Sequence, residues 1–216
     1  MTITVYGATY STRTQRVLLV LEKLGLVFEI KDIDLAKGEH RSHDFIAAHH
    51  PFGKVPAIED DGVKIFESRA IARYLVNKYP GPLSLPRDSA TLADFEVAAS
   101  VDYAYFEPAV SKLGWEKLFK KFITGQEADT GVVSQLEGEL RDVLDYYENV
   151  LAQRTWLAGQ EFSLVDVFHI PWFNFLYTKL GYEEEIQSRP RLAAWWAKAS
   201  QDSAWKKILG EQHRNS

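Results

Sequence analysis

Residues 51–70 read PFGKVPAIEDDGVKIFESRA and decide the fold. Two short apolar runs, at 56–58 and 63–66, flank a polar turn that contains Gly62. This pattern predicts a β-hairpin. The apolar residues that follow recur with helical period: Ile71, Tyr74 and Leu75. The second hairpin strand therefore leads directly into a helix that starts at Glu67 and Ser68.

The start of that helix suits a carboxylate. The first turn of a helix has backbone N–H groups without internal partners, and the helix dipole places positive charge there. Val55-Pro56 offers a second docking edge, because a cis bond would leave the Val55 N–H and C=O free to pair with an extended peptide. These residues fit a site for a small peptide with a carboxylate. They fit equally a hairpin and a helix that only pack together.

The segment before the hairpin predicts a βαβ unit. Residues 2–6 alternate and are rich in β-branched side chains, which favours a strand. Apolar residues from 17 to 24 share one helical face, and residues 27–33 form the next strand. A helix between two strands usually makes a parallel, right-handed crossover. Ser11 lies at the start of the intervening helix, where its plain role is an N-cap.

The remaining pattern divides the chain into two domains. A short helix at 42–49 completes a βαβαββα order for a first domain over residues 1–79. Residues 80–87, PGPLSLPR, carry three prolines and predict a linker. Residues 88–216 show helical period almost throughout and predict an all-α domain. Its expected helices span 91–113, 115–122, 132–152, 164–180 and 192–209. The fold class is therefore α/β followed by all-α.

Composition restricts the function. The 216 residues carry a net charge of −5 and no cysteine. The acidic balance argues against nucleic acid or an anionic membrane as a partner. No segment approaches a membrane span and no signal peptide is apparent, so we expect a cytoplasmic protein. Without cysteine, any sulfur chemistry must use a ligand's sulfur.

Histidines do not predict a metal site. The adjacent pair His49-His50 is expected to end a surface helix, because neighbouring side chains seldom converge on one ion. His169 has apolar neighbours and is expected to be a hydrogen-bonded core residue.

Several motifs, in their order and spacing, resemble the cytosolic glutathione transferases, most closely the phi class of plants and fungi. The resemblance spans nearly the whole chain. In the first domain the motifs are STRTQRV at 11–17, GEHR at 38–41, PFGKVP at 51–56 and FESRAI at 66–71. In the second domain they are FEP at 106–108, SKL at 111–113, LAG at 157–159, SLVD at 163–166 and HIP at 169–171.

The resemblance implies a thioredoxin-like domain that binds glutathione as co-substrate, with no metal, and a helical domain that contributes the pocket for an apolar electrophile. It implies a cis Val55-Pro56 bond, with the Val55 backbone pairing with the cysteinyl part of glutathione. Glu67 and Ser68 would hold the γ-glutamyl end. The glycine end would be bound by His40, Arg41 and Lys54. A homodimer is also implied, and Phe52 is a candidate to insert into the partner chain.

In this family context Ser11 is the candidate catalytic residue. A thiol with a pKa of about 8.5 is mostly protonated at neutral pH, and only its thiolate is a competent nucleophile. Lowering that pKa by two units takes about 2.7 kcal/mol. A hydrogen bond to a charged group contributes about 1.5–3 kcal/mol, so a Ser11 hydroxyl with the helix dipole suffices. Tyr6 is the competing phenol, although we expect it to pack as a strand aromatic.

The second substrate is the least specified. The residues expected to line an electrophile pocket are Tyr10, Thr12, Leu35, Phe119 and Tyr177. Reduction of organic hydroperoxides needs the same thiolate and is a second expected activity. The alternative function is a non-catalytic carrier on the same fold that binds glutathione adducts or aromatic ligands.

Overall fold

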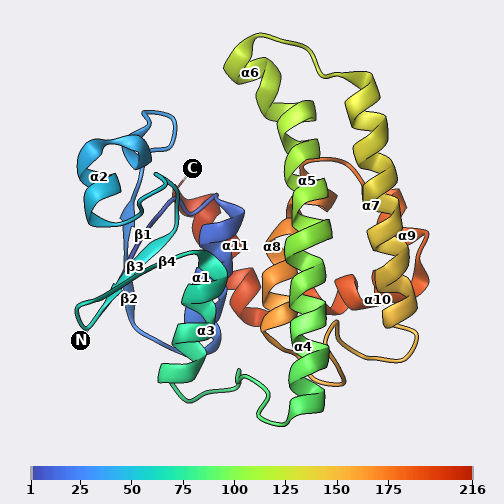
Figure 1. The fold of residues 1–216 in the computed structure, drawn as a ribbon, viewed down its shortest axis with the longest axis horizontal. Helices are drawn as coiled ribbons and strands as arrows, with labels where there is room; N and C mark the ends of the chain where they lie inside the picture. Colours follow the sequence, from blue (N-terminus) through green and yellow to red (C-terminus); the bar gives the residue numbers. More distant parts are fainter. Residues whose placement is uncertain (1, 216) are drawn as a thin grey trace. The chain divides into compact units, whose positions relative to one another are not determined.

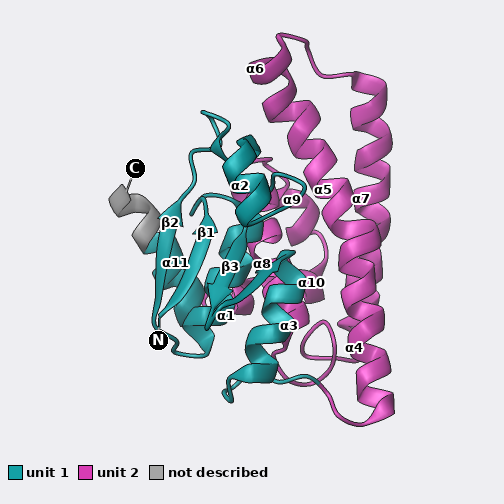
Figure 2. Ribbon diagram, turned by 60° about the vertical axis from the view of Figure 1, so that its left-hand side comes forward, with its two compact units in different colours: residues 1–85, 202–216 teal, residues 86–201 magenta. Residues whose placement is uncertain are grey.

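The structure is a computed structural model that describes residues 2–215, with side chains described over residues 2–210. Two compact units make up the chain (Figure 2). Unit 1 comprises Met1–Leu85 and Asp202–Ser216, and unit 2 comprises Pro86–Gln201.

Unit 1 is built on a four-stranded mixed sheet in the order β2-β1-β3-β4 (Figure 1). The strands are β1 (Ile3–Gly7), β2 (Phe28–Asp32), β3 (Ala57–Asp60) and β4 (Val63–Phe66). β1 pairs with β2 in parallel and with β3 antiparallel, and β3 pairs antiparallel with β4. The parallel crossover and the hairpin predicted from the sequence are both confirmed.

The helices of unit 1 complete the βαβαββα order. They are α1 (Thr12–Lys23), the 3-10 turn η1 (Glu39–Arg41), α2 (His43–Ala48) and α3 (Ser68–Lys78). Alternation along β1 buries Val5 on the face that α1 and α3 cover, while Tyr6 stacks on His49 at the end of α2, on the opposite face. Gly7 permits the close approach of α1, since a Cβ there would lie 2.7 Å from Thr14 Cγ2.

The last helix, α11 (Ser203–Asn215), belongs to unit 1. The sequence pattern instead predicted one helix over 192–209 within the second domain. That run is broken, because Asp202 caps a new helix by accepting the N–H of Ala204 at 3.0 Å. Asp202 also pairs with Lys23 of α1 at 2.6 Å. The domain boundaries stay a prediction, with this difference at the C-terminus.

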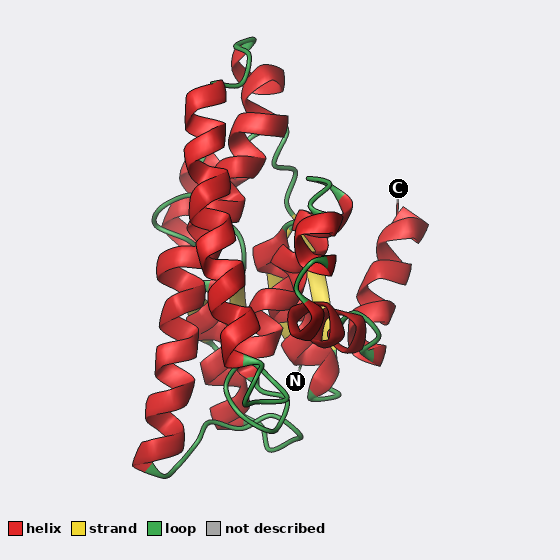
Figure 3. Ribbon diagram, turned by 90° about the vertical axis from the view of Figure 1, so that its right-hand side faces the viewer, coloured by secondary structure: helices red, strands yellow, loops and turns green. Residues whose placement is uncertain are grey.

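Unit 2 consists of helices and loops, apart from one isolated β-bridge (Figure 3). Its α-helices are α4 (Ser89–Val101), α5 (Glu107–Gly114), α6 (Lys120–Thr124), α7 (Thr130–Val150), α8 (Leu164–Thr178), α9 (Glu183–Gln187) and α10 (Pro190–Ala199). Two π-helical turns, η2 (Asp102–Phe106) and η3 (Trp115–Phe119), join α4, α5 and α6. η2 ends two residues before Pro108, which has no N–H to donate to the preceding turn. α9 is absent from the sequence prediction.

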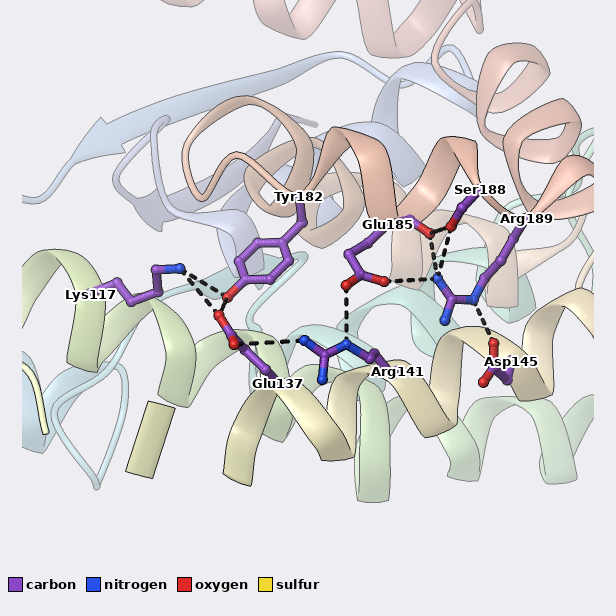
Figure 4. A network of polar contacts seen from close by, with 8 residues as sticks. All are labelled: Lys117, Glu137, Arg141, Asp145, Tyr182, Glu185, Ser188 and Arg189. Carbon is purple, nitrogen blue, oxygen red and sulfur yellow. Dashed lines mark hydrogen bonds and ion pairs between the residues drawn. The ribbon is translucent and has the colours of Figure 1, made fainter. Parts of the chain in front are cut away.

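A polar network fixes α9 against α7 (Figure 4). Tyr182, just before α9, donates its hydroxyl to Glu137 of α7. Arg141 Nε donates to Glu185 at 3.1 Å, and Arg189 Nε donates to Asp145 at 2.7 Å. The short helix is therefore held by contacts with distant residues more than by its own five-residue sequence.

The core of unit 2 contains His169, as predicted. Its side chain is fully buried, with Nε2 2.7 Å from the Tyr147 hydroxyl and Nδ1 2.7 Å from the Val165 carbonyl. Ser163 and Asp166 form a capping box at the start of α8. Over the part of the chain that the structure describes, no helix meets the length and hydrophobicity needed to cross a bilayer.

Candidate functional site

Strand pairing in unit 1 brings the predicted peptide-binding segments together at one end of the neighbouring strands of the sheet. Ala57 pairs with both Tyr6 of β1 and Phe66 of β4. Pro56 therefore lies beside Glu67, at the ends of neighbouring strands. Ser11 follows the end of β1, where its N–H donates to the Ala8 carbonyl at 2.9 Å.

Ser11 is half-buried and is the N-cap of α1. Its Oγ accepts the N–H of Thr14 at 3.5 Å, which is a long contact for a cap. Among the hydrogen bonds of residues 2–210, none uses the Ser11 hydroxyl as donor. The proton of this hydroxyl is thus available to a ligand at the positive end of α1.

The Val55-Pro56 bond is cis, as the resemblance implies. The Val55 side chain is buried. Neither the N–H nor the C=O of Val55 has a hydrogen-bond partner within the described residues. An extended peptide beside this edge would find one free donor and one free acceptor.

The start of α3 is the second predicted docking point. Glu67 precedes the helix with a φ of 70°, a conformation that non-glycine residues seldom adopt and that is often found at functional sites. The first backbone bond of the helix runs from the Ile71 N–H to the Glu67 carbonyl, and the positive end of the helix dipole lies at this start. The buried Ser68 Oγ accepts from Arg16 Nη1 at 2.8 Å. A buried guanidinium therefore fixes one of the predicted binding residues.

Three basic residues lie near the hairpin entrance. Arg41 and Lys54 are exposed, and neither forms an ion pair with a described residue. Burial, followed by the charge of Arg41, lowers the pKa of His40, and His40 Nδ1 is buried without a hydrogen-bond partner in residues 2–210. Gly53 allows this loop to approach, since it has a φ of 57° and a Cβ there would lie 2.9 Å from the His40 carbonyl.

His50 is a site neighbour that the sequence analysis misplaced. The prediction of a surface helix end is wrong for this residue, because its side chain is only 2% exposed. Its Nδ1 accepts the N–H of Phe52 at 3.3 Å. The one sequence signal was its place directly before the Pro51-Phe52-Gly53 turn.

Tyr6 packs as the sequence predicted. Its ring stacks on His49 with the ring centroids 3.8 Å apart. Burial, and then the charge of Glu59, raise the pKa of the Tyr6 phenol. A phenol held in this way is a poor candidate for activating a thiol.

The residues predicted for the electrophile pocket are divided between the units. Tyr10 is exposed, and Thr12 and Leu35 are half-buried, in unit 1. In unit 2, the Phe119 ring stacks on Phe175 and the Tyr177 hydroxyl donates to Glu183 at 2.7 Å. The pocket as a whole stays a prediction. No cluster of His, Asp and Glu suited to a metal ion occurs in residues 2–210.

Comparisons with known proteins agree in both halves of the chain. Residues 1–77 match the family model "Glutathione S-transferase, N-terminal domain", and residues 106–202 match "Glutathione S-transferase, C-terminal domain". Glutathione S-transferase PM239X14 of Arabidopsis thaliana is 38% identical over 220 residues, covering 100% of this chain and 97% of that protein.

Solved structures are similar over the same length. The crystal structure of poplar glutathione transferase F1 is 34% identical with a TM-score of 0.91, and the match covers 100% of both chains. Glutathione S-transferase I from maize, in complex with an atrazine glutathione conjugate, is 29% identical with a TM-score of 0.87 and covers 97% of both chains.

Proposed function

The chain belongs to the glutathione S-transferase family, in its phi class, and from this premise we propose that it joins the glutathione thiolate to apolar electrophiles with Ser11 as the activating residue. The observation that carries the proposal is the convergence at one sheet edge of the Ser11 hydroxyl, the unpaired Val55 backbone and the start of α3.

Each part of the tripeptide has a chemically suited partner. Val55 pairs with the backbone of the cysteinyl residue, next to Pro56. The γ-glutamyl carboxylate lies at the α3 N-terminus, where Ser68 donates to it and the positive end of the helix dipole stabilises it. The glycine carboxylate is bound by Arg41 and Lys54 with His40 beside them, and neither cation has a competing carboxylate among the described residues.

Ser11 then stabilises the thiolate over the thiol. Its hydroxyl donates a hydrogen bond to the sulfur, and the dipole of α1 adds positive potential at the same place. The thiolate attacks the electrophilic carbon, the carbon–sulfur bond forms, and the leaving group departs with the electron pair. Peroxide reduction belongs to the proposal as a second activity of the same thiolate.

The electrophile is proposed to be apolar and aromatic. The exposed Tyr10 and Phe119 support this class of substrate, with Thr12, Leu35 and Tyr177 completing the proposed pocket. The maize relative was crystallised with an atrazine glutathione conjugate. The alternative is a carrier that binds such adducts without turnover, and the cytoplasm stays the predicted compartment.

Substitution of Ser11 tests the mechanism. We expect Ser11→Ala to lower conjugation of a chloronitrobenzene by about 25-fold at pH 7, because a rise in the thiol pKa from about 6.5 to about 8.5 reduces the thiolate from roughly three quarters to roughly 3% of the bound glutathione. Ultraviolet titration of bound glutathione should show a higher thiol pKa in the variant. Turnover of cumene hydroperoxide should fall in parallel.

Two control variants accompany this test, one for the loss of a helix cap and one for the competing phenol of Tyr6. Asp88→Ala removes a comparable cap, in which Oδ1 accepts the Thr91 N–H at 2.9 Å, and should retain activity. Tyr6→Phe should also retain it. Loss of conjugation only in Tyr6→Phe would overturn the assignment of Ser11. Glutathione-affinity retention without turnover of either substrate would favour the carrier.

A homodimer is part of the proposal. Phe52 is 72% exposed at the turn before the hairpin. Unit 2 carries a pocket of about 410 Å3 between the α4–α5 run and α7, with apolar residues Val101, Ala104, Tyr105, Val143 and Tyr146 in its lining. An aromatic side chain from a second copy fits the apolar character of this pocket.

A further inference from the structure

His50 occupies a central position among the glutathione-binding segments without being one of the proposed ligands. Its ring lies 4.8 Å from that of Phe66, the last residue of β4, and 6.2 Å from that of Phe52. Phe66 directly precedes Glu67, and Phe52 lies two residues before Lys54. One buried side chain therefore contacts both the turn that leads to Val55 and the strand that leads to α3.

The imidazole also closes the turn. His50 Nδ1 accepts the Phe52 N–H at 3.3 Å, and the His50 carbonyl accepts the Gly53 N–H at 2.8 Å. A side-chain acceptor bonded to the backbone two residues onward is the pattern that Asn and Asp use in Asx-turns. Since Nδ1 is an acceptor, the ring is neutral and its proton is on Nε2.

The charged groups that act on His50 are the site residues themselves. Burial lowers the pKa of His50 most strongly, the nearby Glu67 opposes this by raising it, and Lys54 lowers it further. Glu67 comes from the start of α3 and Lys54 from the turn. The other packed side chains, Phe52 and Phe66, carry no charge.

We propose that His50 is a positioning residue of the glutathione site, whose neutral ring ties the turn bearing Lys54 and Val55 to the strand that delivers Glu67. The inference rests on the proposed function and deepens it, because it assigns the relative placement of the two ends of the bound tripeptide to one side chain. Protonation removes the acceptor at Nδ1 and brings a second N–H against that of Phe52. Binding of the tripeptide therefore weakens when His50 is protonated.

The test uses S-methylglutathione, which has no thiol to titrate, with its dissociation constant measured calorimetrically at pH 5.5 and 7.5. We expect the wild type to bind severalfold more weakly at the lower pH, and by less than about tenfold, because the lowered pKa of His50 permits only partial protonation there. His50→Asn keeps an acceptor for the Phe52 N–H but cannot titrate, so it should bind like the wild type at pH 7.5 and lose most of the pH dependence. His50→Ala should bind about tenfold more weakly at both values.

His49→Asn is the matched control, because His49 stacks on Tyr6 and should leave both constants unchanged. If His50→Asn retains the full pH dependence, or binds as weakly as His50→Ala at pH 7.5 while its far-ultraviolet spectrum is native, the inference fails. If His50→Ala binds S-methylglutathione as tightly as the wild type at pH 5.5 and at pH 7.5, the inference also fails. Absence of wild-type binding at any pH would instead refute the proposed glutathione site, so the two failures are distinct.

Discussion

Two N-cap serines, Ser163 and Ser11, differ in whether the protein itself uses the proton of the hydroxyl group. Ser163 Oγ accepts the Val165 N–H at 3.2 Å and donates to Asp166, so the capping box uses both of its roles. Ser11 is followed three positions later by Thr14, which gives it no carboxylate to donate to. The Ser11 hydroxyl therefore keeps a proton for a ligand. This difference is readable from the sequence, because the third residue of the helix decides it.

Asp166 is the residue whose loss should be most costly to stability. It is fully buried, and its oxygens accept from the N–H groups of Leu157 (3.1 Å) and Ser163 (2.9 Å) and from the Trp195 indole (2.9 Å). Asp166→Asn places an NH2 group against one of these donors. We expect a loss of about 3 kcal/mol in the free energy of unfolding, measured with urea.

The surface carboxylate Asp145 provides the comparison for that measurement. It pairs with Arg189 at 2.7 Å, but its side chain is 62% exposed. Asp145→Asn should shift the urea midpoint much less, because exposed ion pairs contribute little. Equal losses for the two variants would contradict the importance given to the buried acceptor.

At the scale of elements, α3 is fixed near both of its ends. Its start is held through Ser68 and Arg16, and its end through Lys78 and Tyr79, which both donate to Asp60 of β3. Asp60 also accepts from Tyr74 at 2.9 Å. The helix that carries the proposed γ-glutamyl site is therefore attached to the sheet by a buried carboxylate with three donors.

This attachment predicts an acid-sensitive stability. Burial alone would raise the pKa of Asp60, but hydrogen bonds from Lys78, Tyr79 and Tyr74 outweigh it and lower that pKa below its ordinary value of 3.8. The stability that Asp60 contributes is thus fully present above about pH 4 and is lost as the pH falls through the lowered value. Urea unfolding at a series of acidic pH values should show this loss in the wild type.

Asp60→Asn should remove that part of the pH dependence and lower stability at neutral pH. Tyr74→Phe, which deletes one donor, should give an intermediate loss. If Asp60→Asn leaves the loss of stability at acidic pH unchanged, other carboxylates cause that loss.

At the scale of the whole molecule, the proposed dimer is the main expectation. The chain mass is 24.6 kDa, and light scattering should give about twice this value at micromolar concentration. Phe52→Glu should shift the distribution to the monomer, because a carboxylate cannot enter an apolar pocket without a large desolvation cost.

Phe122→Glu is the matched control, since Phe122 is 89% exposed and is not a proposed contact. Its mass should equal that of the wild type. A monomeric wild type, or a dimeric Phe52→Glu chain, would overturn this part of the proposal.

The four strands and the helices α1, α2 and α3 of unit 1, the long helices of unit 2 and the family could all be predicted from the sequence alone. Periodicity, turn residues and caps are local, so they can be read from neighbouring positions. The short α9 and the break at 200–202 escaped, because long-range contacts and a single capping carboxylate decide them. Ser11, Val55 and Glu67 were identified through motifs, and their roles still await the experiments above.

Contacts between side chains that are far apart in the sequence depend on the packed fold. Arg16 and Ser68 are 52 positions apart, and Lys23 and Asp202 are 179 apart. The burial of His50 likewise depends on Phe66, which the hairpin brings back to it. No local pattern encodes these contacts, because they arise only when the sheet and its helices have packed.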